Sequence, residues 1–193
     1  MSLTKVKTDM VNSNPLKAIL LFVIPMMLGN LFQQFYNVVD SVIVGKFVGM
    51  SALASVGASY SVTAVFIAVA SGGSMGCAVI ISQYFGACDY NKMKTCISTF
   101  IITFLAISVF LAVLGAFSGD TILSFIKTPE SSFKGASEYL RIYFYGLPFL
   151  FMYNVLSAVF NSMGDSRTPL TLLLFSSVLN IFMDLYFVVS LNM

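Results

Sequence analysis

The chain has 193 residues, of which 58% are hydrophobic and only 9% are charged. Soluble domains carry about 25% charged residues, so this composition excludes an ordinary soluble domain and indicates an integral membrane protein whose main partner is the lipid bilayer. The net charge of +2 is dispersed along the chain without a basic run, which excludes nucleic acid as a partner.

Five apolar stretches are long enough to cross a bilayer, which requires about 20 helical residues each. We expect these spans at residues 15–45, 52–85, 96–117, 139–161 and 169–191. They predict an all-α, polytopic helical bundle of about five transmembrane helices. Residues 1–14 form an N-terminal tail, and residues 15–193 form one transmembrane lobe.

The first span begins near Pro15 and contains Pro25, which is expected to kink it because proline lacks a backbone donor. A polar stripe lies on this span, with members related by helical spacings of three and four residues: Asn30, Gln33, Gln34, Asn37 and Asp40. These intervals place the side chains on one helical face, which must meet protein or water rather than lipid.

The second span is too long to cross upright, so it must tilt, bend or project. After the third span, the segment "TILSFIK" could lie along the membrane interface as a short amphipathic helix. The fourth span carries Tyr139 and Tyr143, then Asn154, Ser157 and Asn161, at intervals of three and four residues. It therefore has a polar face of its own.

The segment "GDSRTP" stops one helix at Gly164 and starts the next at Pro169. In the fifth span, Ser176, Asn180 and Asp184 follow at steps of four. A second carboxylate is thus expected within apolar sequence.

Basic residues favour the cytoplasmic side of a membrane. Their distribution is most consistent with a multi-pass protein of the cell membrane whose N-terminus is cytoplasmic. That side then holds Lys5, Lys7, Lys17, Lys92, Lys94 and Arg167.

An aspartate at the centre of a bilayer costs about 2.5–3.5 kcal/mol on insertion scales, so Asp40 and Asp184 are functional candidates. The chain has no histidine and few basic residues within its spans, which leaves a bound cation or proton as the counter-charge. Hard oxygen ligands suit Na⁺, and burial favours a protonated carboxyl, so both ions remain open. Alternatively, Asp40 is interfacial and the amides only join helices.

Several segments together resemble one transporter family. They are "NPLKAILLFVIPMMLGNLFQQFYNVVDSVIVG", "ALASVGAS", "ISQYFGACDYNKMK", "YLRIYFYGLPF", "GDSRTPL" and "LNIFMDLYF", in this order. The chain from about Asn14 onward is similar to the multidrug and toxic compound extrusion (MATE) family.

The resemblance implies a transporter of twelve helices in two six-helix lobes, which exports cationic or amphipathic compounds in exchange for Na⁺ or H⁺. It assigns cation binding to Asp40, Asn180 and Asp184, and cavity lining to Gln34, Asn37, Tyr139 and Asn154. No catalytic residue and no cofactor other than the coupling ion are implied.

The chain ends at Met193, before a sixth span, so we expect an incomplete N-terminal lobe without its C-terminal partner lobe. We accordingly expect no transport by these residues alone. Whether they are a fragment or a truncated product is left open.

Three other classes of membrane protein are alternatives. A flippase for lipid-linked precursors or polysaccharides would favour a basic cavity, whereas these spans carry acids and amides. An intramembrane aspartyl protease could use paired aspartates, but no GxGD motif precedes a buried acid here. In a purely structural subunit, the polar stripes would only pack helices.

Overall fold

The structure, a computed structural model, describes residues 15–190. Its elements are α2 (Pro15–Ile43), the π-helix η1 (Val44–Val48), α3 (Met50–Gly86), α4 (Tyr90–Phe125), α5 (Glu130–Ser162), α6 (Arg167–Leu185) and the π-helix η2 (Tyr186–Ser190). Residues 15–190 contain no strand, which confirms the predicted all-α class. The predicted tail at residues 1–14 lies outside the described residues.

The helices are longer than the predicted spans at several ends. The third begins at Tyr90 because the side chain of Asp89 accepts a hydrogen bond from the Lys92 backbone N–H and caps it. The fourth begins at Glu130. The separate interfacial helix predicted for "TILSFIK" is wrong, since α4 continues unbroken to Phe125.

By length and composition, four helical stretches in the described part of the chain can cross a membrane: Met50–Gly86, Tyr90–Phe125, Glu130–Ser162 and Arg167–Val188. The chain is therefore a multi-pass membrane protein. The first predicted span forms α2, a 29-residue helix with Pro25 inside it. Because α2 is not among the four, its crossing stays a prediction.

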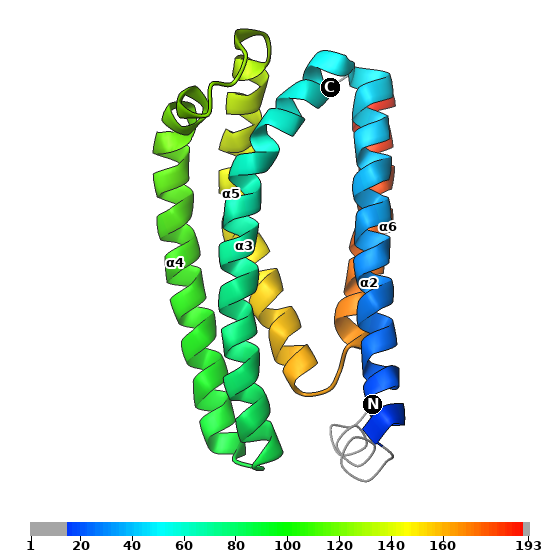
Figure 1. Ribbon diagram of the computed structural model, residues 1–193, viewed down its shortest axis with the longest axis vertical. Coiled ribbons are helices and arrows are strands. Elements are labelled where there is room, and N and C mark those ends of the chain that lie inside the picture. The colour runs from blue at the N-terminus through cyan, green and yellow to red at the C-terminus, as the bar shows by residue number, and fades with distance from the viewer. Residues whose placement is uncertain (1–14, 191–193) are drawn as a thin grey trace. The chain divides into compact units, whose positions relative to one another are not determined.

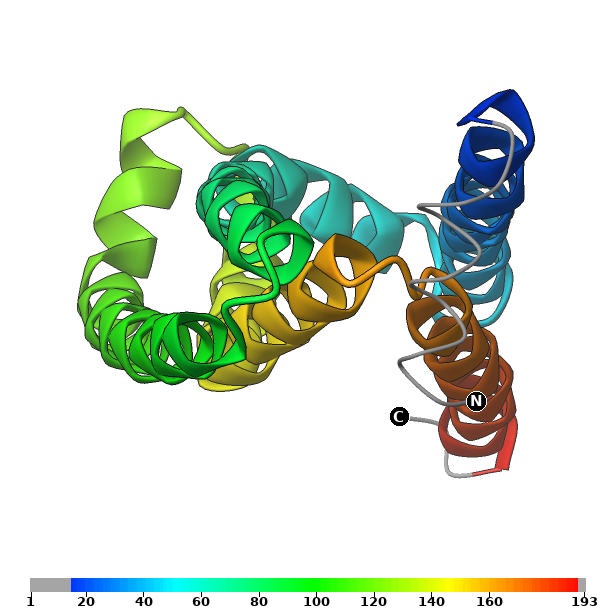
Figure 2. The same ribbon diagram turned by 90° about the horizontal axis from the view of Figure 1, so that it is seen from below.

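The chain divides into two compact units. The first unit contains α2, residues 160–166, α6 and η2. The second unit is Val44–Val159, with η1, α3, α4 and most of α5. Figure 2 shows α2 beside α6 in one group and α3, α4 and α5 in the other.

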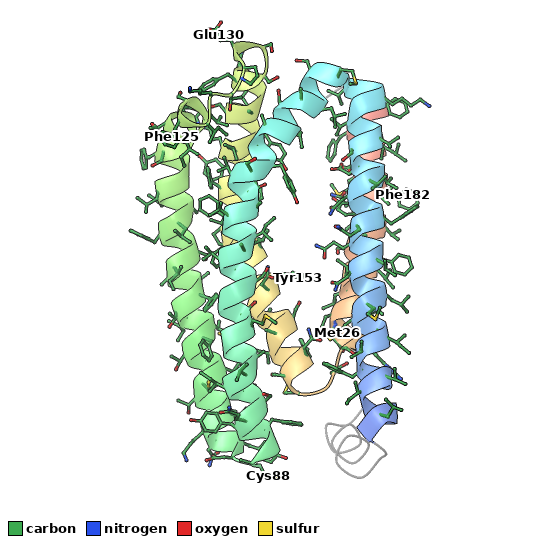
Figure 3. The ribbon with its side chains drawn as sticks, in the orientation of Figure 1. Met26, Cys88, Phe125, Glu130, Tyr153 and Phe182 are labelled. Atoms are coloured by element: carbon green, nitrogen blue, oxygen red, sulfur yellow. The ribbon has the colours of Figure 1, made fainter. Side chains whose placement is uncertain are left out.

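The second unit has a close-packed core. Its fully buried side chains include Phe144, Leu147 and Phe151 of α5. The ring of Phe144 occupies the place where a Cβ on Gly115 of α4 would lie, so that glycine allows α4 and α5 to approach closely. Cys88 lies at the turn from α3 to α4, and Glu130 lies after the turn at the opposite end of α4 (Figure 3).

Hydroxyl groups also join α3 to α5 within this unit. Ser55 Oγ shares its proton between the carbonyl of Ser51 on its own helix at 3.0 Å and that of Ser132 on α5 at 3.2 Å. Ser59 Oγ likewise shares its proton between the carbonyls of Ser55 at 2.9 Å and Ala136 at 3.3 Å. Ser59 is fully buried. Because lipid offers no partners for backbone carbonyls, such contacts hold helices at a defined distance.

In the first unit, α2 and α6 are direct neighbours that run in the same direction (Figure 1). The pair has no comparable core, since Pro169 is the only buried residue of α6. Phe182 on α6 points outward and is 69% exposed (Figure 3). Contact along the pair is therefore confined to one narrow seam.

Candidate functional site: two acids on α2 and α6

The structure brings the two predicted acids together. Asp40 lies near the end of α2, and Asp184 lies near the end of α6. Both side chains are half-buried, and they are close enough for a hydrogen bond between the two carboxyl groups. Such a bond requires a proton on one of the two groups, because ionised carboxylates only accept hydrogen bonds. A bound cation would replace that bond by bridging the two carboxylates, which otherwise repel each other.

Oxygen atoms at this site lack protein partners. Asp184 Oδ2 and Asn180 Oδ1 are both buried atoms without a hydrogen-bond partner in the structure. One turn of α6 separates these residues, so they share a helical face. Buried oxygens are normally bonded, and an exception points to an ion, a water or a functional role.

A short polar turn positions α6. Asp165 Oδ1 accepts hydrogen bonds from the backbone N–H groups of Arg167 and Thr168, both at 3.1 Å. The hydroxyl of Thr168 donates to Asp165 Oδ2 at 2.7 Å. These bonds satisfy orphan donors at the helix N-terminus and fix where α6 begins.

Both acids stand just before a π-helical segment. The segment η1 begins four residues after Asp40, and η2 begins two residues after Asp184. A π-helical turn departs from the regular α-helical bonding pattern and is frequent at functional sites. The sequence analysis did not predict either segment.

Gln34 and Asn37, predicted to line the cavity, lie on α2 and are exposed. Asn37 Nδ2 donates to Gln34 Oε1 at 3.2 Å. The two amides therefore form a polar patch on α2, and a role in binding an exported compound stays a prediction.

Tyr139 and Asn154, the other predicted lining residues, belong to the second unit. Tyr139 stacks on Tyr143, with ring centroids 6.5 Å apart. Asn154 Nδ2 donates to the Leu150 carbonyl at 2.9 Å, and Asn154 Oδ1 accepts a longer hydrogen bond of 3.5 Å from Ser71 Oγ. Their association with the acids of the first unit stays a prediction.

The donor set suits a hard cation. Two carboxyl groups and one amide oxygen supply only oxygen atoms and at most two negative charges. Within residues 15–190, no group of three or more His, Cys, Asp and Glu side chains could hold a metal ion. The site therefore fits Na⁺ or a proton better than a transition metal, which favours nitrogen and sulfur ligands.

Sequence reasoning gave no individual role to two residues of the first unit. Asn161 Oδ1 is a further buried atom without a partner. Ser166, treated only as part of a helix-start segment, is 4% exposed and donates from Oγ to the carbonyl of Phe22 at 3.0 Å. A serine at a helix start is ordinary, so only its burial against α2 distinguishes it.

The sequence matches the family model for MatE over residues 25–186. The chain belongs to the MatE family. A probable multidrug resistance protein of Bacillus subtilis, YpnP, is 35% identical to this MatE chain over 172 residues, which cover 89% of the chain and 39% of YpnP. The multidrug export protein MepA of Staphylococcus haemolyticus is 26% identical over 172 residues, covering 89% of the chain and 38% of MepA.

Solved MATE structures share the fold. A crystal structure of MATE in the bent conformation matches with a TM-score of 0.87 at 26% identity, covering 99% of this chain and 42% of that chain. An outward-facing multidrug resistance MATE transporter matches with a TM-score of 0.88 at 27% identity, covering 95% of this chain and 41% of that chain. The MatE chain thus spans about 40% of these relatives and corresponds to the N-terminal part of such a transporter.

Proposed function

We propose that this chain supplies the ion-coupling part of an antiporter that exports cationic or amphipathic compounds in exchange for Na⁺ or H⁺. The observation that carries the proposal is the contact of Asp40 with Asp184 beside the unpartnered oxygen of Asn180. Similarity to proteins named for multidrug resistance and export supports the class of substrate. The proposal is transport across the cell membrane, with the N-terminus cytoplasmic, rather than catalysis.

The two acids would act as one exchange site. With a proton or Na⁺ between them, the carboxyl groups attract the shared cation and hold α2 against α6. Without it, two negative charges repel each other in a medium of low dielectric constant, and the helices separate at this end. The cation thus biases a two-state helix pair, which is how ion binding can be coupled to release of another compound.

Cavity lining by Gln34, Asn37, Tyr139 and Asn154 is part of this proposal. Amide and aromatic side chains can hold an organic cation through hydrogen bonds and through the ring face. A flippase for anionic headgroups is not favoured, because the site in the first unit presents acids and amides rather than basic groups.

The direct test is stabilisation of the purified chain by the coupling ion. Raising Na⁺ at constant ionic strength should raise the melting temperature, because a ligand at 100 times its Kd stabilises a protein by about 2.7 kcal/mol. A parallel series at different pH values tests the proton. Asp40→Asn and Asp184→Asn should each abolish the response.

Asp120→Asn serves as the matched control, because Asp120 lies on α4 in the second unit and its carboxyl accepts a hydrogen bond from Ser137. It should keep the full ion response. In vesicles that carry the whole transporter, each site variant should also lose gradient-driven export. Equal ion responses in the unaltered chain and in both site variants would refute the proposed function.

A further inference from the structure

The seam between α2 and α6 has one constant register. Two polar contacts, each between positions 144 apart in sequence, define it: Ser166 with Phe22, and Asp184 with Asp40. Between them, Gly29 packs against Leu170 and Leu173, which are 141 and 144 positions away and so agree with this register. A constant separation is what two parallel helices in fixed register produce. Both helices rise together in Figure 1.

The contacts also lie on one face of each helix. Steps of 7 and 11 residues separate the three positions on α2, and the same steps separate those on α6. These steps correspond to about two and three helical turns, so the side chains align. At 1.5 Å per residue, the 18 residues from Phe22 to Asp40 span about 27 Å. This distance is comparable to the thickness of the hydrocarbon core.

The middle of the seam is formed by a glycine packed against apolar side chains. A Cβ on Gly29 would lie 3.5 Å from Leu170 Cδ1 and 3.8 Å from Leu173 Cδ2, which is ordinary packing distance. Apolar surfaces do not drive association in lipid, because the lipid tails are equally apolar. Contacts of this kind allow α2 and α6 to pack closely without strongly defining how far one helix slides along the other.

Unlike this apolar packing, the hydrogen bond of Ser166 is directional. Its hydroxyl is 4% exposed and reaches the Phe22 carbonyl at 3.0 Å. Three residues further along, Pro25 lacks the N–H that would bond the Leu21 carbonyl, so the regular bonding of α2 is interrupted one residue before Phe22. A buried polar contact in an apolar seam has the property that fixes register in helix pairs.

We propose that Ser166 is a positioning residue whose hydroxyl sets the register of α6 on α2, so that Asp184 meets Asp40 at the far end of the seam. The contact also gives the pair a fixed end. Repulsion between the acids then opens the seam at the distant end, while the Ser166 end stays closed. The opening of the seam at the acid end rests on the proposed function. The register set by Ser166 does not depend on it.

Disulfide cross-linking in native membranes tests the register. In a chain whose Cys77, Cys88 and Cys96 are replaced by alanine, we would introduce Ile43→Cys and Phe187→Cys, two positions with the same separation of 144. These cysteines should cross-link readily. Adding Ser166→Ala should lower the rate of cross-linking about three- to tenfold, which is the equilibrium effect of one hydrogen bond.

The controls separate register from bulk stability. Thr171→Val removes a hydroxyl of α6 that bonds only within its own helix, to the Arg167 carbonyl at 2.9 Å, and should leave the rate unchanged. Ser166→Thr should restore the rate because it keeps the donor, whereas Ser166→Val, of similar size, should not. Equal rates with alanine, valine and threonine at position 166, or a Ser166→Ala chain that fails to insert, would overturn the proposal.

The Na⁺ and pH titrations of the unaltered chain test the proposed function separately. If that chain responds to an ion, Ser166→Ala should weaken the apparent affinity by about the same three- to tenfold factor without abolishing the response. A chain that shows the cross-linking pattern without any ion response would retain the register proposal and refute the proposed function. A cross-linking rate that Ser166→Ala leaves unchanged, together with a normal ion response of the unaltered chain, would refute the register proposal and retain the proposed function.

Discussion

The two units of this chain combine similar helices in different ways. In the second unit, α5 places whole aromatic side chains such as Phe144 and Phe151 out of contact with the surroundings. In the first unit, α6 has comparable apolar residues, yet Phe182 remains 69% exposed and only Pro169 is buried. The second unit is held together by buried side chains, whereas in the first unit α2 and α6 contact each other along their length and leave their other faces exposed.

The buried polar groups of the two units also differ in whether they have hydrogen-bond partners. The buried hydroxyls of Ser55 and Ser59 in the second unit bond to carbonyl groups of α5. In the first unit, oxygen atoms of Asn180 and Asp184 are buried without a partner, whereas the second unit has one such oxygen among the described residues, on Thr128. A bonded polar group stabilises one arrangement, whereas an unbonded oxygen is available to an ion. The proposed ion binding and release therefore belong to the first unit.

The largest expected effect comes from the core of the second unit. Phe144→Ala should destabilise the chain by about 2–3 kcal/mol, less than in a water-soluble core because a bilayer supplies little of the transfer term. The measurement is the melting temperature in detergent. Phe182→Ala on α6 is the matched comparison and should change it little, since that ring is exposed. Equal losses would remove the distinction between the units.

The helices themselves could be predicted because apolar length is a strong signal. Their ends could not, since Asp89 starts α4 within a polar segment that appeared to be a connector. Hydropathy does not distinguish a capped helix that extends into water from a loop. The predicted interfacial helix failed for the same reason, because residues 121–125 continue α4.

The acid pair was predictable in part. Intervals of three and four residues place Asp184 on a polar face, and the shortage of basic residues left it without a counter-charge. Five alternating spans imply that the first and the fifth run in the same direction, but the sequence could not show that α2 and α6 are neighbours with one offset, because register depends on contacts between distant segments. Nor could it distinguish Ser166 from any other serine at a helix start.

A smaller change in stability is expected from the hydrogen bonds that join α3 to α5 in the second unit. Ser59→Ala removes a hydroxyl that bonds both to the Ser55 carbonyl of its own helix and to the Ala136 carbonyl of α5. The bond to α5 should make this loss about 0.6 kcal/mol, the average for hydrogen bonds between membrane helices. Ser176→Ala on α6 is the matched change in the first unit, where the hydroxyl bonds only to the Leu173 carbonyl of its own helix. Thermal melts should separate the two variants. A larger loss for Ser176→Ala would contradict the proposed division of roles.

The smallest effect is expected at the exposed start of α4, where charge rather than packing operates. The pKa of Asp89 is held below its ordinary value by the backbone N–H of Lys92, which donates to Oδ1 at 3.1 Å, and by the Lys92 ammonium, 3.0 Å from Oδ2. A carboxyl whose pKa is lowered on folding stabilises the folded chain above its unfolded pKa of about 3.9. That contribution is lost as the pH falls through the lower folded pKa.

The measurement is the melting temperature of the unaltered chain and of Asp89→Asn between neutral and strongly acidic pH. Asparagine keeps the capping oxygen and removes the charge, so the two chains should differ slightly at neutral pH and converge below about pH 3.9. Asp89→Ala should remain less stable than Asp89→Asn throughout, because it loses the cap as well. A difference between the unaltered chain and Asp89→Asn that persists in acid would show that the contribution at this helix start is not due to the carboxylate charge.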